Sequence, residues 1–343
     1  MKVLITGAAG FLGSHIVDQC LEQGVEVRVI VRKSSDLSYL KTLGSKIEYS
    51  FGDLTDVAAV NESAEGIQVI YHSAGRVRDY GNYSDFYSAN CTATHNLLEA
   101  SRLKGVKRFV FISSPSIFAD EHDHLNLDES IPYPQHFANY YAKTKALAEQ
   151  EVLEANCPQL VTCSLRPRGV WGPRDKTGFM PKLMGSLAKG KLKNLAPGKR
   201  VLTSLCHVEN IANACLAAAV SPNVGGQAYF ITDSEPLALW GFVDEVARIF
   251  QLPPLQGELN PKILKIAIES CEFIWKLPLL RDRYSPPISR YAVGLLTQHG
   301  TYSIAKARRD FGYNPVVTTQ DGIRDLKTWI EGNGGMEGFL RYL

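Results

Sequence analysis

The sequence predicts an α/β protein: a doubly wound parallel sheet followed by a smaller, irregular α/β domain. In the first half of the chain, short apolar runs rich in β-branched residues alternate with helical patterns. This alternation is typical of strand–helix–strand units with right-handed crossovers. After about residue 166 it stops, and proline and glycine become frequent. The length of 343 residues also exceeds that of one typical domain, so we expect two.

The expected elements of the sheet domain follow in order. Buried strands are predicted at residues 3–5, 25–31, 47–49, 69–71, 109–112 and 161–165. Helices are predicted between them, among others at residues 13–23, 87–103 and 140–154. We place the sheet domain at residues 1–165, with the strand and Ala-rich helix of residues 201–220 returning to it, and the second domain at residues 166–343.

Composition and charge exclude several classes of protein. Hydrophobic residues make up 45% and charged residues 21% of the chain, as in ordinary globular proteins. The 37 basic and 35 acidic side chains give a net charge of +2, which gives no reason to expect nucleic acid as a partner. Seven scattered cysteines without a Cys-x-x-Cys pair predict free thiols and no metal site. Because a strand starts the chain and no long apolar run exists, we expect neither a signal peptide nor a membrane span, and a cytoplasmic protein.

A glycine-rich loop joins the first strand to the first helix. Its spacing is Gly-x-x-Gly-x-x-Gly, which allows a tight turn, a close approach of the backbone to a diphosphate and close packing of helix on strand. The diphosphate would accept hydrogen bonds from free amides at the start of the helix. The residues expected to bind it are Gly7, Gly10, Phe11, Leu12 and Gly13.

The end of the second strand indicates which dinucleotide binds. An acidic residue here would bind the 2′-hydroxyl of NAD, whereas arginine accommodates the 2′-phosphate of NADP. The strand ends in Arg32 and Lys33, and no carboxylate follows until Asp36. These cations predict NADP rather than NAD, although a solvated basic turn is the alternative.

Two further strand ends are candidates for cofactor contacts. Asp53 and Leu54 follow the third strand, where the carboxylate could meet the adenine edge. Ser73, Ala74 and Gly75 follow the fourth strand and could let the backbone approach the cofactor. Surface turns are the alternative in both places.

Three side chains form a candidate catalytic group. Tyr141 and Lys145 are four residues apart on one helical face, so an ammonium could lower the phenol's pKa from its usual value of about 10. Ser114 lies at the carboxyl end of a predicted central strand, where ligands of doubly wound sheets bind. A simple strand-end cap is the alternative for Ser114, and Ser113 or Ser116 could share its role.

These features together resemble the extended short-chain dehydrogenases/reductases. Further matching stretches lie at residues 165–175, 225–233, 286–290 and 302–308. They resemble in particular the branch of 3β-hydroxysteroid dehydrogenases, sterol-4α-carboxylate 3-dehydrogenases and 2-alkyl-3-oxoalkanoate reductases. The resemblance implies a Rossmann domain, Tyr141 as general acid or base, Lys145 as its pKa-lowering partner and ribose ligand, and Ser114 as the residue that orients the substrate oxygen. It also implies cofactor contacts at Pro167 and Val170.

Arg168 departs from the pattern of these families, which usually have a small residue or histidine there. Next to the expected nicotinamide, its guanidinium could bind a substrate carboxylate through two hydrogen bonds. Pairing with Asp175 or another structural acid is the alternative.

The expected function is an NADP-dependent oxidoreductase interconverting a secondary alcohol and a ketone on a hydrophobic small molecule, such as a 3-oxo steroid or a 2-alkyl-3-oxo acid. A nucleotide-sugar epimerase or dehydratase with tightly bound NAD, and a non-catalytic NADP-binding regulator, are the alternatives. An amphipathic helix at residues 262–277 predicts a wall of the substrate pocket or a peripheral membrane contact. The resemblance also makes a homodimer an expectation.

Overall fold

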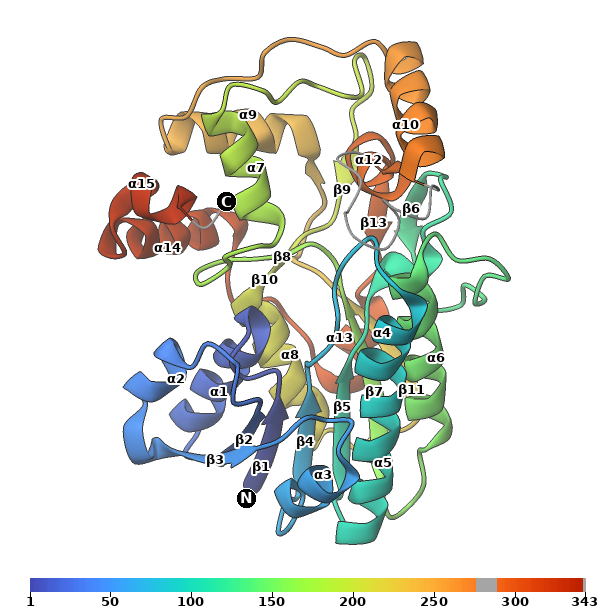
Figure 1. Ribbon diagram of the computed structural model, residues 1–343, viewed down its shortest axis with the longest axis vertical. Helices are drawn as coiled ribbons and strands as arrows, with labels where there is room; N and C mark the ends of the chain where they lie inside the picture. Colours follow the sequence, from blue (N-terminus) through green and yellow to red (C-terminus); the bar gives the residue numbers. More distant parts are fainter. Residues whose placement is uncertain (276–288, 342–343) are drawn as a thin grey trace.

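The computed structural model describes residues 1–275 and 289–341. Its largest sheet has seven strands in the order β11-β7-β5-β4-β1-β2-β3, and all neighbouring strands are parallel (Figure 1). The strands are β1 (Lys2–Thr6), β2 (Glu26–Val31), β3 (Ile47–Phe51), β4 (Val69–His72), β5 (Arg108–Ile112), β7 (Val161–Pro167) and β11 (Gln227–Ile231). The predicted doubly wound sheet is confirmed, and the strand order reverses between β1 and β4, where such sheets bind their ligands.

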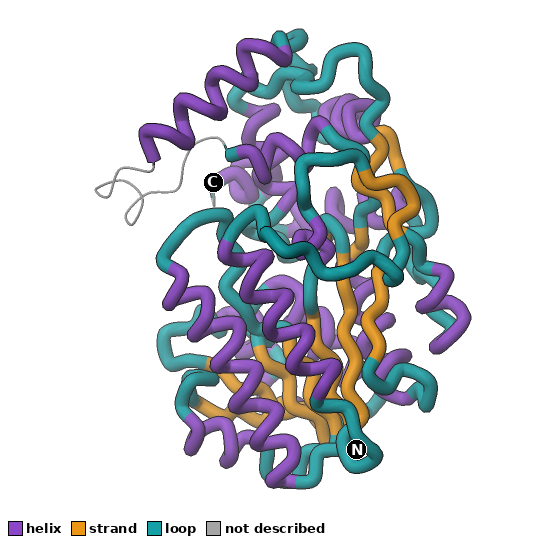
Figure 2. Tube along the Cα trace, turned by 90° about the vertical axis from the view of Figure 1, so that its right-hand side faces the viewer, coloured by secondary structure: helices purple, strands orange, loops and turns teal. Residues whose placement is uncertain are grey.

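Helices cover both faces of this sheet (Figure 2). Along β1, Val3 and Ile5 pack toward α1 and α8, whereas Leu4 packs toward α3, α5 and α6. Because both faces are buried, the strands appear in the sequence as nearly continuous apolar runs. The helices of the first half are α1 (Phe11–Glu22), α2 (Ser38–Thr42), α3 (Val57–Ser63), α4 (Tyr83–Tyr87), α5 (Ala93–Lys104) and α6 (Tyr140–Glu154), with short 3₁₀ turns at Gly44–Lys46 and Pro115–Phe118.

The helix predicted at residues 87–103 is interrupted. A π-helical turn at Ser88–Thr92 separates α4 from α5, so one extra residue is accommodated between them. Gly105 then ends α5 in the left-handed conformation, with φ of 69°. The start of α6 is fixed by Asn139, whose side chain accepts a hydrogen bond from the Ala142 amide at 2.8 Å.

The return of the chain to the sheet differs from the expectation. In residues 201–220 the helix α8 (Val208–Val220) packs beside α1, but the preceding strand β10 (Cys206–His207) pairs with β8 (Val170–Trp171) and not with the large sheet. The seventh strand of the large sheet is β11, which the sequence pattern did not predict as a strand. A five-residue run after two glycines carries too little periodic signal to distinguish a strand from a loop.

Most helices of the second part of the chain, among them α7, α9, α10 and α12, lie in the upper half of Figure 1, whereas α8, β11 and α13 pack with the large sheet. The second core of the protein joins α7, α9, α14 and α15, and includes Trp171 and Phe242. A small sheet in the order β12-β9-β13-β6 lies beside it. The elements are β6 (His124–Leu127), α7 (Phe179–Ala188), β9 (Leu202–Thr203), β12 (Leu237–Ala238), α9 (Leu239–Ile249), α10 (Pro261–Trp275), α12 (Arg290–Thr297), β13 (Gly300–Tyr302), α13 (Ala305–Phe311), α14 (Thr319–Gly332) and α15 (Gly335–Leu340).

The predicted amphipathic helix is α10, and its apolar residues divide between two faces. Leu264, Ile268 and Cys271 are buried, and the first two pack with Val293 of α12. Ile263 and Ile274, predicted on the same stripe, are exposed. Residues 276–277 of this prediction and residues 286–288 of the family-like stretch lie outside the described residues. No helix in the described ranges is long and apolar enough to cross a membrane.

Candidate active site

The glycine loop after β1 has the shape that a diphosphate requires. Gly7 adopts φ of +68°, and a Cβ there would lie 2.7 Å from the Ala74 amide nitrogen. A Cβ on Gly13 would lie 2.2 Å from the Gly7 carbonyl oxygen. Gly10 starts α1 without a side-chain cap, so the first amides of the helix, beginning with Phe11 and Leu12, have no intrahelical acceptor. The loop therefore fits a dinucleotide, whose diphosphate would accept hydrogen bonds from these amides.

The predicted ribose and adenine residues lie at the carboxyl ends of β2 and β3. Arg32 and Lys33 are both exposed. Asp53 accepts hydrogen bonds from the Thr55 amide and hydroxyl, and these bonds, with a smaller contribution from Arg32, hold its pKa below the usual range. The Leu54 carbonyl is occupied by the side-chain amide of Asn96 at 2.9 Å. An anionic carboxylate beside an arginine thus borders the site on this side.

The loop after β4 is held by buried polar residues that sequence reasoning missed. The Ser73 hydroxyl donates to the Thr6 carbonyl at 2.7 Å, and the Ala74 amide donates to the Thr6 hydroxyl at 3.1 Å. His72 lies 2.7 Å from that hydroxyl, and burial lowers its pKa to about 3, so its imidazole is neutral. These contacts fix the backbone before Gly75, which is exposed at the edge of the site.

Asn90, in the π-helical turn, connects the same loop to the helix that carries the candidate tyrosine. Its side-chain oxygen accepts from the Arg76 amide at 2.7 Å, and its side-chain nitrogen donates to the Thr144 hydroxyl at 3.0 Å. The signal that could have identified it is a buried amide inside an irregular helical turn, a common feature of functional sites. The sequence pattern showed only a continuous helix.

The candidate catalytic hydroxyls come together after β5. Ser116 donates its hydroxyl proton to the Ser114 hydroxyl oxygen at 2.8 Å, and its amide donates to the same oxygen at 3.2 Å. Both serine hydroxyls are close enough to the Tyr141 phenol to favour its charged form. Burial nevertheless raises the pKa of Tyr141 above its usual value, more than the two serines lower it. Because Ser116 uses its own proton on Ser114, the Ser114 proton is available for another acceptor. The Ser113 hydroxyl is buried without a partner in the described residues.

Lys145 is buried under the end of β5. Its ammonium donates to the Ile112 carbonyl oxygen and lies 4.0 Å from the centre of the Phe111 ring. Desolvation lowers the pKa of Lys145 to about 7, although Glu149 favours the charged form. Lys145 does not act on the Tyr141 pKa in the described structure, where its ammonium donates to the Ile112 carbonyl oxygen, and its expected effect on the phenol stays a prediction.

We expect Lys145 to make the stability of the nucleotide-free protein depend on pH. Between about pH 7 and 10 the folded protein loses this proton while the unfolded chain keeps it, so the lysine's cost to stability falls as pH rises. The Tm of Lys145→Met minus the Tm of wild type should therefore decrease from pH 6 to pH 9. The decrease should be about 2–4 °C for each kcal/mol of unfolding free energy that the wild type gains over this range. Scanning fluorimetry measures it, with Lys143→Met on the same helix as control. A difference independent of pH would contradict this placement of the ammonium.

A cavity of about 640 Å³ lies close to the candidate catalytic group; Ser114, Ser116 and Tyr141 do not line it themselves, but Tyr140 and Lys143 on the same helix as Tyr141 do. The cavity is bordered by the loops after β4 and β5, the start of α6, and by α10 and α12. Tyr291 of α12 lines it, and its phenol is close enough to Ser116, Tyr141 and Arg168 for each of them to act on its pKa. Sequence reasoning missed Tyr291, because 150 residues separate it from Tyr141 and no local pattern joins them.

Arg168 also lines this cavity, in the segment between Pro167, which ends β7, and Val170, which begins β8. It forms no ion pair with an acid of the described residues, and its Nε is buried without a hydrogen-bond partner. Its polar neighbour is the Tyr302 hydroxyl. The alternative of pairing with Asp175 is wrong, since that carboxylate accepts from the Thr177 and Gly178 amides and burial raises its pKa to about 6.

The strand order, the glycine loop and the cavity at the carboxyl edge of the sheet define an extended short-chain dehydrogenase/reductase. Residues 4–257 match the 3-beta hydroxysteroid dehydrogenase/isomerase family, and the chain belongs to that family. It is therefore an NAD(P)-dependent oxidoreductase.

Similar proteins cover almost the whole chain. A 2-alkyl-3-oxoalkanoate reductase of Stenotrophomonas maltophilia is 34% identical over 334 residues, covering 95% of this chain and 98% of the relative. A 3-beta-hydroxysteroid dehydrogenase of Mycolicibacterium neoaurum is 33% identical over 340 residues, covering 94% and 90%. Among solved structures, MoeE5 in complex with UDP-glucose and NAD superposes with a TM-score of 0.74 at 21% identity, covering 97% and 99%, which shows a shared fold.

Proposed function

We propose that the protein is an NADP(H)-dependent oxidoreductase that interconverts a ketone and a secondary alcohol on a hydrophobic substrate bearing a carboxylate near the ketone, as in 2-alkyl-3-oxo acids. The observation that carries the proposal is that Ser114 and Ser116 surround the Tyr141 phenol, while Tyr291, their neighbour, lines a cavity together with Arg168, which has no acidic partner among the described residues. The name of the Stenotrophomonas relative supports this class of substrate.

The reduction needs two bonds to form. A bound reduced nicotinamide supplies the hydride that forms the new C–H bond. Tyr141 donates its proton to the carbonyl oxygen, which becomes the hydroxyl, and Ser114 donates a hydrogen bond to the same oxygen. The raised pKa of Tyr141 keeps the phenol protonated at neutral pH, the form needed for reduction. Lys145 would hold the nicotinamide ribose. The hydroxyls of Ser114 and Ser116 would orient the substrate's carbonyl oxygen toward the phenolic proton of Tyr141.

The 2′-phosphate is assigned to Arg32 and Lys33, because both cations are exposed at the end of β2. Steady-state kinetics with NADPH and NADH test this assignment. A lower KM for NADPH is expected, and a clear preference for NADH would refute it.

Arg168 is expected to recognise the carboxylate. Two charge-assisted hydrogen bonds from a guanidinium are worth a few kcal/mol. In Arg168→Ala we expect kcat/KM for a 2-alkyl-3-hydroxy acid to fall by about 10- to 100-fold, with little change for its methyl ester. Oxidation of the hydroxy compounds with NADP is the practical assay, because 3-oxo acids lose carbon dioxide on standing. Equal losses on acid and ester would assign Arg168 a structural role.

The second candidate, a nucleotide-sugar epimerase or dehydratase, is favoured only by the fold shared with MoeE5. Such enzymes retain their NAD through the catalytic cycle. NAD that remains bound to the purified protein, together with turnover of a UDP-sugar, would replace the proposal. Absence of turnover on any ketone or alcohol would instead favour a non-catalytic NADP-binding protein.

A further inference from the structure

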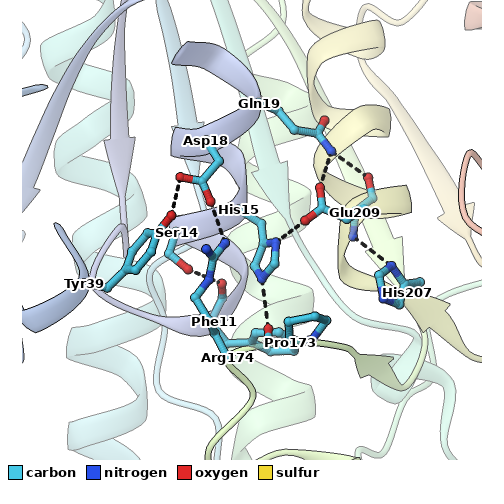
Figure 3. A network of polar contacts seen from close by, with 10 residues as sticks. All are labelled: Phe11, Ser14, His15, Asp18, Gln19, Tyr39, Pro173, Arg174, His207 and Glu209. Atoms are coloured by element: carbon cyan, nitrogen blue, oxygen red, sulfur yellow. Dashed lines mark hydrogen bonds and ion pairs between the residues drawn. The ribbon is translucent and has the colours of Figure 1, made fainter. Parts of the chain in front are cut away.

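The segment after Gly172 lies against the first helix of the dinucleotide-binding sheet (Figure 3). His15 of α1 faces two acceptors with its ring nitrogens: Nε2 lies 2.9 Å from the Pro173 carbonyl oxygen, and Nδ1 contacts the Glu209 carboxylate. Gln19 also donates to that carboxylate, at 2.6 Å. The segment that leaves β8 is thereby attached to α1, although more than 150 residues separate them.

Arg174 extends this attachment to α2. Its guanidinium donates to the Asp18 carboxylate at 2.6 Å and lies 4.1 Å from the centre of the Tyr39 ring, and Tyr39 donates to the same carboxylate at 2.6 Å. Arg174 adopts φ of 68°, a conformation that is unfavourable for a residue other than glycine. Such a backbone persists only where surrounding contacts hold it, as the Asp18 and Tyr39 contacts do here.

Two residues further on, Lys176 reaches the turn where the ribose would bind. Its ammonium lies 3.2 Å from an Asp36 carboxylate oxygen. The other carboxylate oxygen of Asp36 accepts from the Ser38 amide at 3.0 Å and from its hydroxyl. This turn begins with Arg32 and Lys33, the residues assigned to the 2′-phosphate. Lys176 thus places a third cation at the turn, from a segment 140 residues away.

We propose that Lys176 determines cofactor specificity by binding the 2′-phosphate of NADP directly, together with Arg32 and Lys33. The inference rests on the proposed function, since it takes NADP as the cofactor. A dianionic phosphate approaching this turn meets the Asp36 carboxylate as well as the two cations. The pair of Lys176 with Asp36 is exposed to solvent and therefore weak, so the ammonium can exchange it for the doubly charged phosphate.

The test compares two ligands that differ only in the phosphate. Titration calorimetry on the full chain gives Kd for 2′,5′-ADP and for 5′-AMP. In Lys176→Gln we expect Kd for 2′,5′-ADP to rise about 5- to 10-fold, as for loss of one solvated charge contact, and Kd for 5′-AMP to stay within about 2-fold. Lys189→Gln is the control, an exposed lysine just after α7 that forms no ion pair with a described acid.

A second variant separates direct binding from neutralisation of Asp36. If Lys176 contacts the phosphate, Lys176→Gln should still weaken 2′,5′-ADP binding in an Asp36→Asn background. No effect in that background would overturn the proposal, because the lysine would then only compensate the carboxylate. An unchanged Kd for 2′,5′-ADP in Lys176→Gln would also overturn it, while leaving the NADP assignment intact. Wild type that binds both ligands equally well would refute that assignment and this inference together.

Discussion

Replacing Tyr141 by phenylalanine should lower kcat by about 10²- to 10⁴-fold, the usual contribution of a positioned proton donor. The phenol is the group on which Ser114 and Ser116 converge, and their neighbour Tyr291 lines the cavity. Loss of the phenol removes the proton that the carbonyl oxygen needs, but no contact that the dinucleotide's diphosphate needs. Kd for NADPH, measured by fluorescence quenching, should therefore stay within about 2-fold of wild type while turnover collapses.

The control is Tyr87→Phe, at an exposed tyrosine of α4 that does not line the cavity. It should retain wild-type turnover. A Tyr141→Phe protein that keeps more than a tenth of the wild-type kcat would show that another group supplies the proton, and Tyr291 would be the first to examine.

Gly13→Ala is expected to abolish tight binding of the dinucleotide. The added Cβ would lie 2.2 Å from the Gly7 carbonyl oxygen and 2.5 Å from its carbon, and backbone cannot yield as a flexible side chain can. Overpacking of this kind costs about 1–3 kcal/mol, and relief by displacing the loop removes the diphosphate's amide donors. We expect Kd for NADPH to rise about 10- to 100-fold or more.

Gly332→Ala is the matched control, because a Cβ at the end of α14 meets nothing within 4 Å. Circular dichroism separates loss of binding from loss of folding. If Gly13→Ala folds and binds NADPH like wild type, the diphosphate does not lie on this loop.

The parts of the site that the sequence predicted are local. The spacing of Gly7, Gly10 and Gly13 and the four-residue separation of Tyr141 and Lys145 can be read without knowing the fold, because each belongs to one loop or one helix. The six strands predicted in the first half were likewise strong apolar runs, and all are present in the sheet. Their burial on both faces makes the signal unusually clear.

The parts that could not be predicted depend on distant segments. Thr6 meets His72 across neighbouring strands, Asn90 meets Thr144 between two helices, and Tyr291 approaches Ser116 from beyond the second core. None of these pairs has a sequence spacing that identifies it. The strand β11 was missed for the same reason, since its pairing with β7 is what makes a short run of residues a strand.

The cavity is bordered on one side by loops of the large sheet and α6, and on the other by α10 and α12, which come later in the chain. The chemistry comes from the ends of sheet strands and from α6, all within residues 4–257 that match the family, whereas α10 and α12 begin only at Pro261 and Arg290. One side of the cavity thus comes from helices that follow the family-matching residues in the chain and take no part in the large sheet. Substitutions in α10, unlike those at Tyr291 of α12, can reshape the cavity without touching the candidate catalytic residues. Hybrid proteins that exchange the stretch after residue 257 should take from the donor the preference for the shape of the apolar part of the substrate, and keep the recipient's cofactor preference and its carboxylate recognition by Arg168.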